Sequence, residues 1–73
     1  NVLVALANLD TQASRKAVAE RMQHDESYVV RATAVWAAHR LGLSIETALL
    51  DSDARVVAMA QDLLADVPAH APS

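Results

Sequence analysis

The sequence predicts an all-α fold in which helices stack in pairs, and three observations lead to this prediction. No segment alternates apolar and polar residues with the period of two that is typical of β-strands. Hydrophobic residues make up 53% of the chain, many of them alanine, whereas glycine occurs once and proline twice. Alanine favours helices and lets them approach closely, but it buries little area per residue. A helical pattern also recurs at a fixed spacing, which is the sequence signature of stacked repeats.

The first expected helix lies in residues 1–9, NVLVALANL. This segment is almost entirely apolar, and no residue ahead of it offers an N-cap. We therefore interpret it as the second half of a helix, and the chain as a fragment of a longer protein.

Polar breaks divide the remaining residues into four further helices. Residues 8–11 offer an N-cap for a helix over about 12–23, and residues 24–27 end this helix and cap the next one, which runs to Leu41. Gly42 follows at the C′ position, where a left-handed backbone is common. Ser44 is expected to cap a short helix through Leu50, and residues 51–53 to cap the last helix, which ends near Ala65.

The C-terminal residues 68–73, PAHAPS, cannot continue a helix because proline interrupts the backbone hydrogen bonding. They are predicted to form a flexible tail, so that the helical repeat domain covers residues 1–67.

The chain overlays itself when it is shifted by 26 residues. Asp25 then aligns with Asp51, and five apolar positions align as well: Val30 with Val56, Ala34 with Ala60, Ala37 with Leu63, Ala38 with Leu64 and Leu41 with Val67. The first nine residues join the series at another shift, in which Ala5, Leu6 and Leu9 match Ala37, Ala38 and Leu41. A single unit cannot bury its apolar face alone, so we expect about two and a half units to stack into a right-handed α-solenoid.

The third helix contains the segment VRATAVWAAHRLG, residues 30–42, which is apolar nearly all the way round. At about 100° per residue, one stripe faces the partner helix of the same unit and comprises Val30, Ala34, Ala37 and Leu41. The two flanks of this stripe are predicted to meet the neighbouring units: Val29 and Trp36 on one side, Val35 and Ala38 on the other. The outward strip then comprises Tyr28, Ala32 and His39, with Val35 at its edge.

Composition limits the classes of function. Seventy-three residues make one small domain. The absence of cysteine excludes disulfides, thiolate metal sites and iron–sulfur ligation within this chain, and it favours a cytoplasmic location. A net charge of −3 argues against a dedicated nucleic-acid binder, and no stretch approaches the ~18 apolar residues of a membrane span.

No catalytic or metal-binding residues are predicted. The single glycine rules out a glycine-rich phosphate loop, and no pair of acids flanks a recognisable substrate pocket. His24, His39 and His70 lack the spacing of metal ligands. Trp36 is predicted to belong to the core rather than to stack on a base.

The segment from Asp25 to Arg31, within D-x-x-x-x-V-R-x-x-A-x-x-A, is similar to the HEAT repeat. In HEAT repeats the turn aspartate and the second-helix arginine form hydrogen-bonded ladders along the stack. The resemblance implies that Asp25 and Arg31 have this structural role, with Arg31 paired to Asp25 or a neighbouring aspartate. The second unit keeps Asp51 but has Val57 in place of the arginine, and we expect the ladder to end there.

Residues 1–42 further resemble the C-terminal HEAT-like region of epoxyqueuosine reductases. That region often reads R-N-x-L-x-A-L-G-N-S-G-D and later V-R-G-H-A-A-W-A-L-G-R-L-G. The first pattern is matched at Asn1, Leu3, Ala5, Leu6 and Asn8, with Asp10 close behind, and the second at Val30, Arg31, Ala34, Trp36, Ala37, Arg40, Leu41 and Gly42. Departures at Ala7, Leu9, Thr33 and His39 fall on turns or outward positions, and they affect partner contacts more than the fold.

The enzymes of that family are oxidoreductases that act on a queuosine precursor in tRNA, with cobalamin and two [4Fe-4S] clusters in their N-terminal domains. The resemblance implies that this chain is an accessory module of such an enzyme, attached to those domains, and that it helps to hold the tRNA anticodon stem-loop. The alternative is a generic HEAT module that scaffolds another protein. A HEAT-like DNA glycosylase is disfavoured because no buried acid among aromatic residues is visible.

The candidate residues for binding RNA or another partner are Arg15, Lys16, His39 and Arg40. The first two share the outer face of the second helix with Glu20 and Gln23, and Lys16 and Glu20 have the spacing of an i,i+4 pair. The other three basic residues, Arg21, Arg31 and Arg55, are expected to be engaged within the fold. Few phosphates can then be neutralised, so tRNA binding by this chain alone is expected to be weak.

Overall fold

The computed structural model describes residues 1–65, and all the regular elements in that range are helices. It contains the α-helices α1 (Val2–Leu9), α2 (Gln12–His24), α3 (Tyr28–Arg40) and α4 (Ala54–Ala65), and the 3₁₀ helix η1 (Glu46–Leu50). The all-α prediction is confirmed for this range. Expectations for residues 66–67 and for the tail 68–73, including His70, lie outside the described residues.

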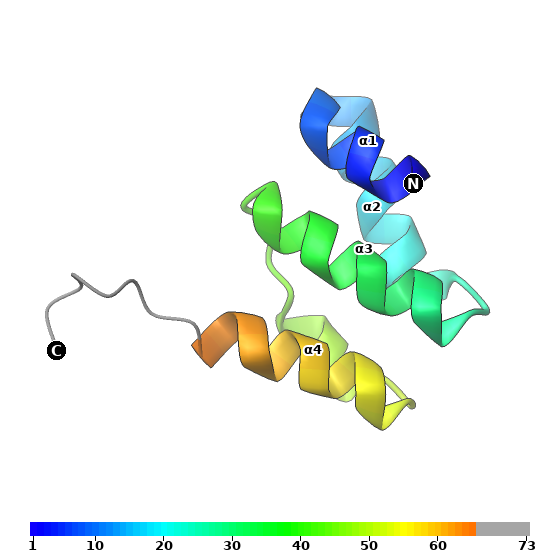
Figure 1. Ribbon diagram of the computed structural model, residues 1–73, viewed down its shortest axis with the longest axis vertical. Helices are drawn as coiled ribbons and strands as arrows, with labels where there is room; N and C mark the ends of the chain where they lie inside the picture. Colours follow the sequence, from blue (N-terminus) through cyan, green and yellow to red (C-terminus); the bar gives the residue numbers. More distant parts are fainter. Residues whose placement is uncertain (66–73) are drawn as a thin grey trace, which may run out of the picture.

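The helices form two layers (Figure 1). Helices α1, α3 and α4 lie side by side in the front layer and run in the same direction, with α2 and η1 behind them. Within the front layer α3 contacts both α1 and α4, while α2 packs against α1 and α3, and η1 packs against α4 and α2. Helices α3 and α4 begin 26 residues apart, at positions 28 and 54, which agrees with the spacing of the sequence repeat.

Local caps begin and end the helices near the predicted positions. Thr11 starts α2 with a capping box, because its Oγ1 accepts from the Ser14 N–H at 3.0 Å and Ser14 Oγ accepts from the Thr11 N–H at 2.8 Å. Ser27 caps α3, and Gly42 has the predicted left-handed backbone with φ of 77°. Asp53 Oδ1 accepts from the Arg55 N–H at 2.8 Å at the start of α4.

Two predicted helix starts are wrong. The first helix does have a cap, since Asn1 Oδ1 accepts from the Leu3 N–H at 2.8 Å. Ser44 caps nothing: its hydroxyl donates to the Glu46 carboxylate, and Ile45 precedes η1 without a side-chain cap. The segment 46–50 is a 3₁₀ helix rather than an α-helix. Five residues close more readily through i→i+3 bonds, such as the one from the Ala48 N–H to the Ile45 carbonyl at 3.0 Å.

The core lies between the two layers and is built largely from alanine and β-branched residues. Its buried hydrophobic members are Leu3, Ala7, Val18, Met22, Ala34, Val35, Ala37, Ala38, Leu41, Ile45, Ala48, Val56 and Ala60. Small side chains in α3 let α1, α2 and α4 approach closely, which explains how one helix can be apolar nearly all round.

The prediction that both flanks of α3 are buried is confirmed in part. Val35 and Ala38 are buried, as expected of a flank, so the placement of Val35 at the edge of the outward strip is wrong. Trp36 is partly buried and packs against the core. Val29, however, is 54% exposed. Helix α1 has 8 residues against 13 in α3, and it can therefore cover only part of α3.

The outward strip of α3 is less exposed than expected. His39 is exposed, but Tyr28 and Ala32 are partly buried against the core. The Arg55 guanidinium lies 3.5 Å above the centre of the Tyr28 ring, so that part of this ring is covered from α4.

Candidate interaction surface

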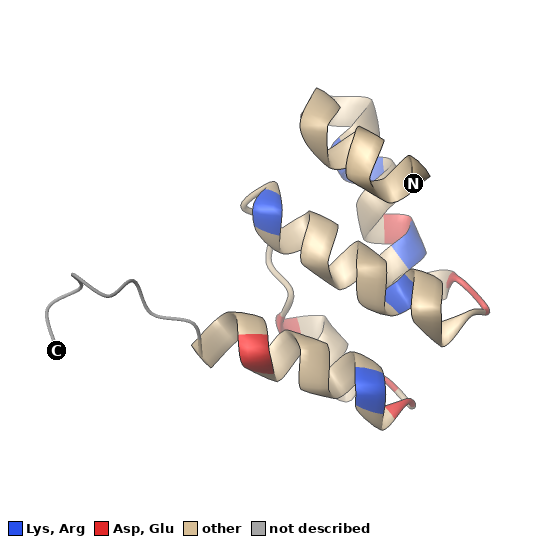
Figure 2. Ribbon diagram, viewed as in Figure 1, with Lys and Arg blue, Asp and Glu red and all other residues tan. Residues whose placement is uncertain are grey.

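The candidate residues lie on two different helices. Arg15 and Lys16 are in α2, in the rear layer, whereas His39 and Arg40 end α3 in the front layer. Figure 2 shows lysine and arginine positions in blue on α2 and at the end of α3. Lys16, His39 and Arg40 are exposed, and Arg15 is partly exposed. The four candidate residues therefore fall into two pairs on different layers of the fold.

Arg15 is engaged within the fold, although the sequence predicts it to be a candidate for binding RNA or another partner. Its Nη1 donates to Asp10 Oδ1 at 2.6 Å. Asp10 ends α1 with a left-handed backbone, φ 46° and ψ 48°, and this turn brings its carboxylate back over the first turns of α2. Asp10 and Arg15 are five residues apart and lie on either side of a turn. Their spacing therefore does not match the i,i+4 pattern of a pair within one helix.

Lys16 and Glu20 form no ion pair in the described structure. The absence of a pair costs little, because exposed pairs contribute at most about 1 kcal/mol. Lys16 therefore presents its ammonium to solvent.

Arg40 lies over an aromatic ring. Its guanidinium carbon is 5.7 Å from the centre of the Trp36 ring, a cation–π geometry that the i,i+4 spacing allows. Part of the exposed surface at the end of α3 is thus a stacked arginine–tryptophan pair with the exposed His39 beside Arg40 in sequence.

Arg31 links the turn before α3 to the turn before α4. Its Nε donates to Asp51 Oδ2 at 2.9 Å and its Nη2 to Asp51 Oδ1 at 3.2 Å, while its Nη1 donates to the backbone carbonyls of Asp25 at 2.8 Å and Glu26 at 3.1 Å. The side chains of Arg31 and Asp51 are 14% and 9% exposed. Arg31 therefore pairs with the aspartate of the following turn, and the carboxylate of Asp25 is bound by Arg21 instead. The remaining basic residue of α4, Arg55, pairs with Asp53.

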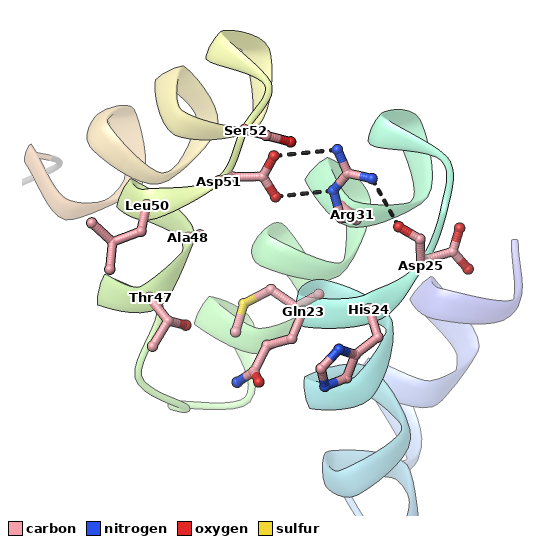
Figure 3. A pocket seen from close by; sticks show the side chains of 10 residues that line it. Gln23, His24, Asp25, Arg31, Thr47, Ala48, Leu50, Asp51 and Ser52 are labelled. Atoms are coloured by element: carbon pink, nitrogen blue, oxygen red, sulfur yellow. Dashed lines mark hydrogen bonds and ion pairs between the residues drawn. The ribbon is translucent and has the colours of Figure 1, made fainter.

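A hollow of about 430 Å³ lies along this junction (Figure 3). One wall is the C-terminal end of α2 with Gln23 and His24, and the other is η1 and the turn after it, with Thr47 and Leu50; the Arg31–Asp51 pair closes one end. Because Arg31 already donates to Asp51 and to two carbonyls, it has little capacity left to bind an anion there.

The turn aspartates are held in their ionised form. The N–H of Ser27 and the side chain of Arg21 lower the pKa of Asp25. Burial raises the pKa of Asp51, but hydrogen bonds from Arg31 and from the Asp53 N–H outweigh it, so this pKa also lies below its usual value. The side chain and backbone N–H of Arg55 lower the pKa of Asp53 to about 2. These carboxylates serve as hydrogen-bond acceptors in turns rather than as acids near neutral pH.

Every buried side-chain nitrogen or oxygen atom in this range has a hydrogen-bond partner. Within residues 1–65 no three histidine or carboxylate side chains converge to hold a metal ion, and the sequence offers no cysteine to ligate a cluster. None of the described helices is long and apolar enough to cross a membrane.

No protein-family model, curated protein or solved structure matches this chain.

Proposed function

We propose that this chain is a HEAT-type helical repeat module that helps an epoxyqueuosine reductase-like enzyme to hold the anticodon stem-loop of its tRNA. The observation that carries the HEAT assignment is the bidentate contact of Arg31 with Asp51, which joins two units of equal spacing. The sequence resemblance of residues 1–42 supplies the enzyme family and its RNA. Cobalamin and the iron–sulfur clusters of that family would belong to other parts of the enzyme.

The few unpaired charges on the surface support a minor contribution of this chain to the binding of RNA. Lys16 and the Arg40–Trp36 stack are the cationic features that have no carboxylate partner in the described residues. Arg15, Arg21, Arg31 and Arg55 each pair with an aspartate. Two or three phosphate contacts give a shallow salt dependence and an affinity on the order of 10⁻⁴ M or weaker. The module would then contribute by adding to the grip of a neighbouring domain.

A titration of labelled anticodon stem-loop RNA into the chain tests this proposal. We expect a dissociation constant near or above about 10⁻⁴ M at physiological salt, as a few phosphate contacts allow, and about a severalfold weaker binding in Lys16→Gln and in Arg40→Gln. Arg55→Gln is the matched control, because it removes a charge from the start of α4. Micromolar binding, or an equal loss in the control, would contradict an accessory role. Complete lack of binding at millimolar RNA would exclude the RNA proposal.

The second candidate function is a protein-binding scaffold, and the exposed apolar residues favour it. Leu50 is 87% exposed, Val2 73% and Leu9 64%, and apolar surface of this kind adds nothing to phosphate binding. Lack of RNA binding in the titration would leave this candidate as the preferred function.

A further inference from the structure

Both aromatic residues of this chain lie beneath an arginine. The sequence contains one tyrosine and one tryptophan, Tyr28 and Trp36, and both are in α3. The guanidinium carbon of Arg55 is 3.5 Å from the centre of the Tyr28 ring, and that of Arg40 is 5.7 Å from the centre of the Trp36 ring. The chain therefore holds two arginine–aromatic stacks, whose other partners can be compared directly.

The two stacked arginines differ in what their nitrogen atoms bind. Arg55 Nε donates to Asp53 Oδ1 at 3.0 Å and its Nη2 donates to Asp53 Oδ2 at 2.8 Å, so a carboxylate fills this fork and balances its charge. Arg40 forms no ion pair with any of residues 1–65, and its side chain is exposed. Its positive charge and its planar fork of N–H donors are thus accessible to a ligand.

The Trp36 ring gives this guanidinium a fixed support. Trp36 is partly buried and packs against the core, and the i,i+4 spacing within α3 places Arg40 over its ring. The guanidinium is planar, and the face that points away from the indole can receive a second planar group. A support that is already held by the core loses little freedom when a ligand binds.

The helix dipole alone does not account for this arrangement. A positive charge in the last turn of α3 is stabilised by the dipole of that helix, and Arg40 fulfils this role. A lysine would fulfil it equally well, because the dipole interacts with charge and not with shape. The planar group over an aromatic ring is the additional feature, and it suits a ligand that stacks.

We propose that the Arg40–Trp36 stack binds one unpaired nucleotide of the RNA. The base lies on the outer face of the Arg40 guanidinium, and phosphate oxygens accept hydrogen bonds from the edge of the same group. A nucleotide combines the planar face and the adjacent anion that this site can bind, and a base within a duplex has its faces covered by its neighbours. The inference rests on the proposed function, whose RNA it takes as the ligand, and it adds a contact with a base to the phosphate contacts.

The indole N–H signal of Trp36 in a proton–nitrogen NMR spectrum reports on this site. Trp36 is the only tryptophan, so the chain gives one such signal. The chain is titrated with anticodon stem-loop RNA, and with the same hairpin whose loop nucleotides keep their ribose and phosphate but lack their bases. We expect the intact hairpin to shift the signal and to bind about fivefold or more tightly than the abasic hairpin, as stacking of one base allows.

Arg40→Lys separates stacking from charge. Lysine keeps the positive charge at the end of α3 but has no planar fork, so this variant should bind the intact and abasic hairpins within about twofold of each other. Lys16→Gln is the matched control, because Lys16 is an exposed cation of α2 that takes no part in the stack. It should weaken the binding of both hairpins by a similar factor and preserve the preference for the intact one.

Equal binding of the two hairpins to the unchanged chain would overturn the inference and leave the RNA proposal in place. A preference for the intact hairpin that persists in Arg40→Lys would do the same. If neither hairpin binds at millimolar RNA, the proposed function fails, and this inference fails with it. A hexaglutamate peptide is the third probe. A shift of the indole signal as large as that caused by the intact hairpin would assign the fork to a carboxylate of a protein and overturn its assignment to a nucleotide.

Discussion

Arg31 divides its hydrogen-bond donors between two turns of the chain. One nitrogen donates to the carbonyls of Asp25 and Glu26 at the start of its own helix, and two nitrogens donate to Asp51 in the next unit. The side chain is 14% exposed, so loss of the guanidinium would leave buried acceptors without partners. Removal of a buried partner costs more than the net gain of forming the bond.

Arg31→Ala should lower the free energy of unfolding by about 1 to 3 kcal/mol. Asp51→Ala should cost a similar amount, and the double variant should cost less than the sum, because both single changes break the same contact. Urea unfolding of the four chains measures this coupling. Arg15→Ala, which breaks the more exposed Arg15–Asp10 pair, is the control and should cost at most about 1 kcal/mol. Additive costs of Arg31→Ala and Asp51→Ala would show that the pair does not join the units.

The contacts of individual side chains are where sequence reasoning fell short. The sequence predicts that Arg31 pairs with Asp25 or a neighbouring aspartate, but the choice of Asp51 depends on how α4 and the turn before it pack against α3. The Arg15–Asp10 pair depends on a left-handed aspartate at the end of α1. Neither feature has a signal in the spacing of residues along one helix.

At the scale of the element, helix ends were predictable because they are set by local chemistry. Thr11, Ser27 and Asp53 cap their helices with side-chain oxygen atoms a few residues away in sequence. The short segment 46–50 was predicted to be helical, but its 3₁₀ geometry was not foreseen. Its length and its contacts with α4 and α2 decide that geometry.

Gly42 provides a test at the end of α3. Its φ is 77°, and a Cβ atom added there would meet no atom within 4 Å. Gly42→Ala should therefore lower the free energy of unfolding by about 1 kcal/mol through backbone strain alone. Gly42→Asn should cost less, because asparagine tolerates the left-handed region better than other residues with a side chain. Thermal or urea unfolding distinguishes the two. A harmless Gly42→Ala, or an asparagine variant that is worse than alanine, would show that this residue is not held in the left-handed conformation.

At the scale of the whole molecule, the described residues arrange helices of matching direction in one layer and cover them from one side. The 26-residue shift of the sequence predicted the distance along the chain between the starts of α3 and α4, because a recurring hydrophobic pattern fixes which faces must be buried. The exposure of Val29 had no sequence signal, because only the assembled structure shows which part of α3 the other helices cover.

Acid should destabilise the whole molecule within a defined pH range. The pKa values of Asp25, Glu46 and Asp51 lie below their usual values, and that of Asp53 is about 2. A carboxyl group whose pKa is lower in the folded chain stabilises the fold above its unfolded pKa, here 3.8 for aspartate. That contribution is lost as the pH falls toward the folded value. The free energy of unfolding should thus change little from pH 7 to about 5 and decrease between about pH 4 and 2.

Urea unfolding at constant ionic strength across this pH range measures the effect. Asp53→Asn retains a hydrogen-bond acceptor for the Arg55 N–H but cannot titrate, so its stability should decrease less steeply between about pH 4 and 2 than that of the unchanged chain. Asp62→Asn, at an exposed position of α4, is the control and should leave the slope unchanged. A decrease that is already complete at pH 5 would contradict the assignment to these turns, because the turn carboxylates are still ionised there. The turns would then not be the acid-sensitive joints between the helices.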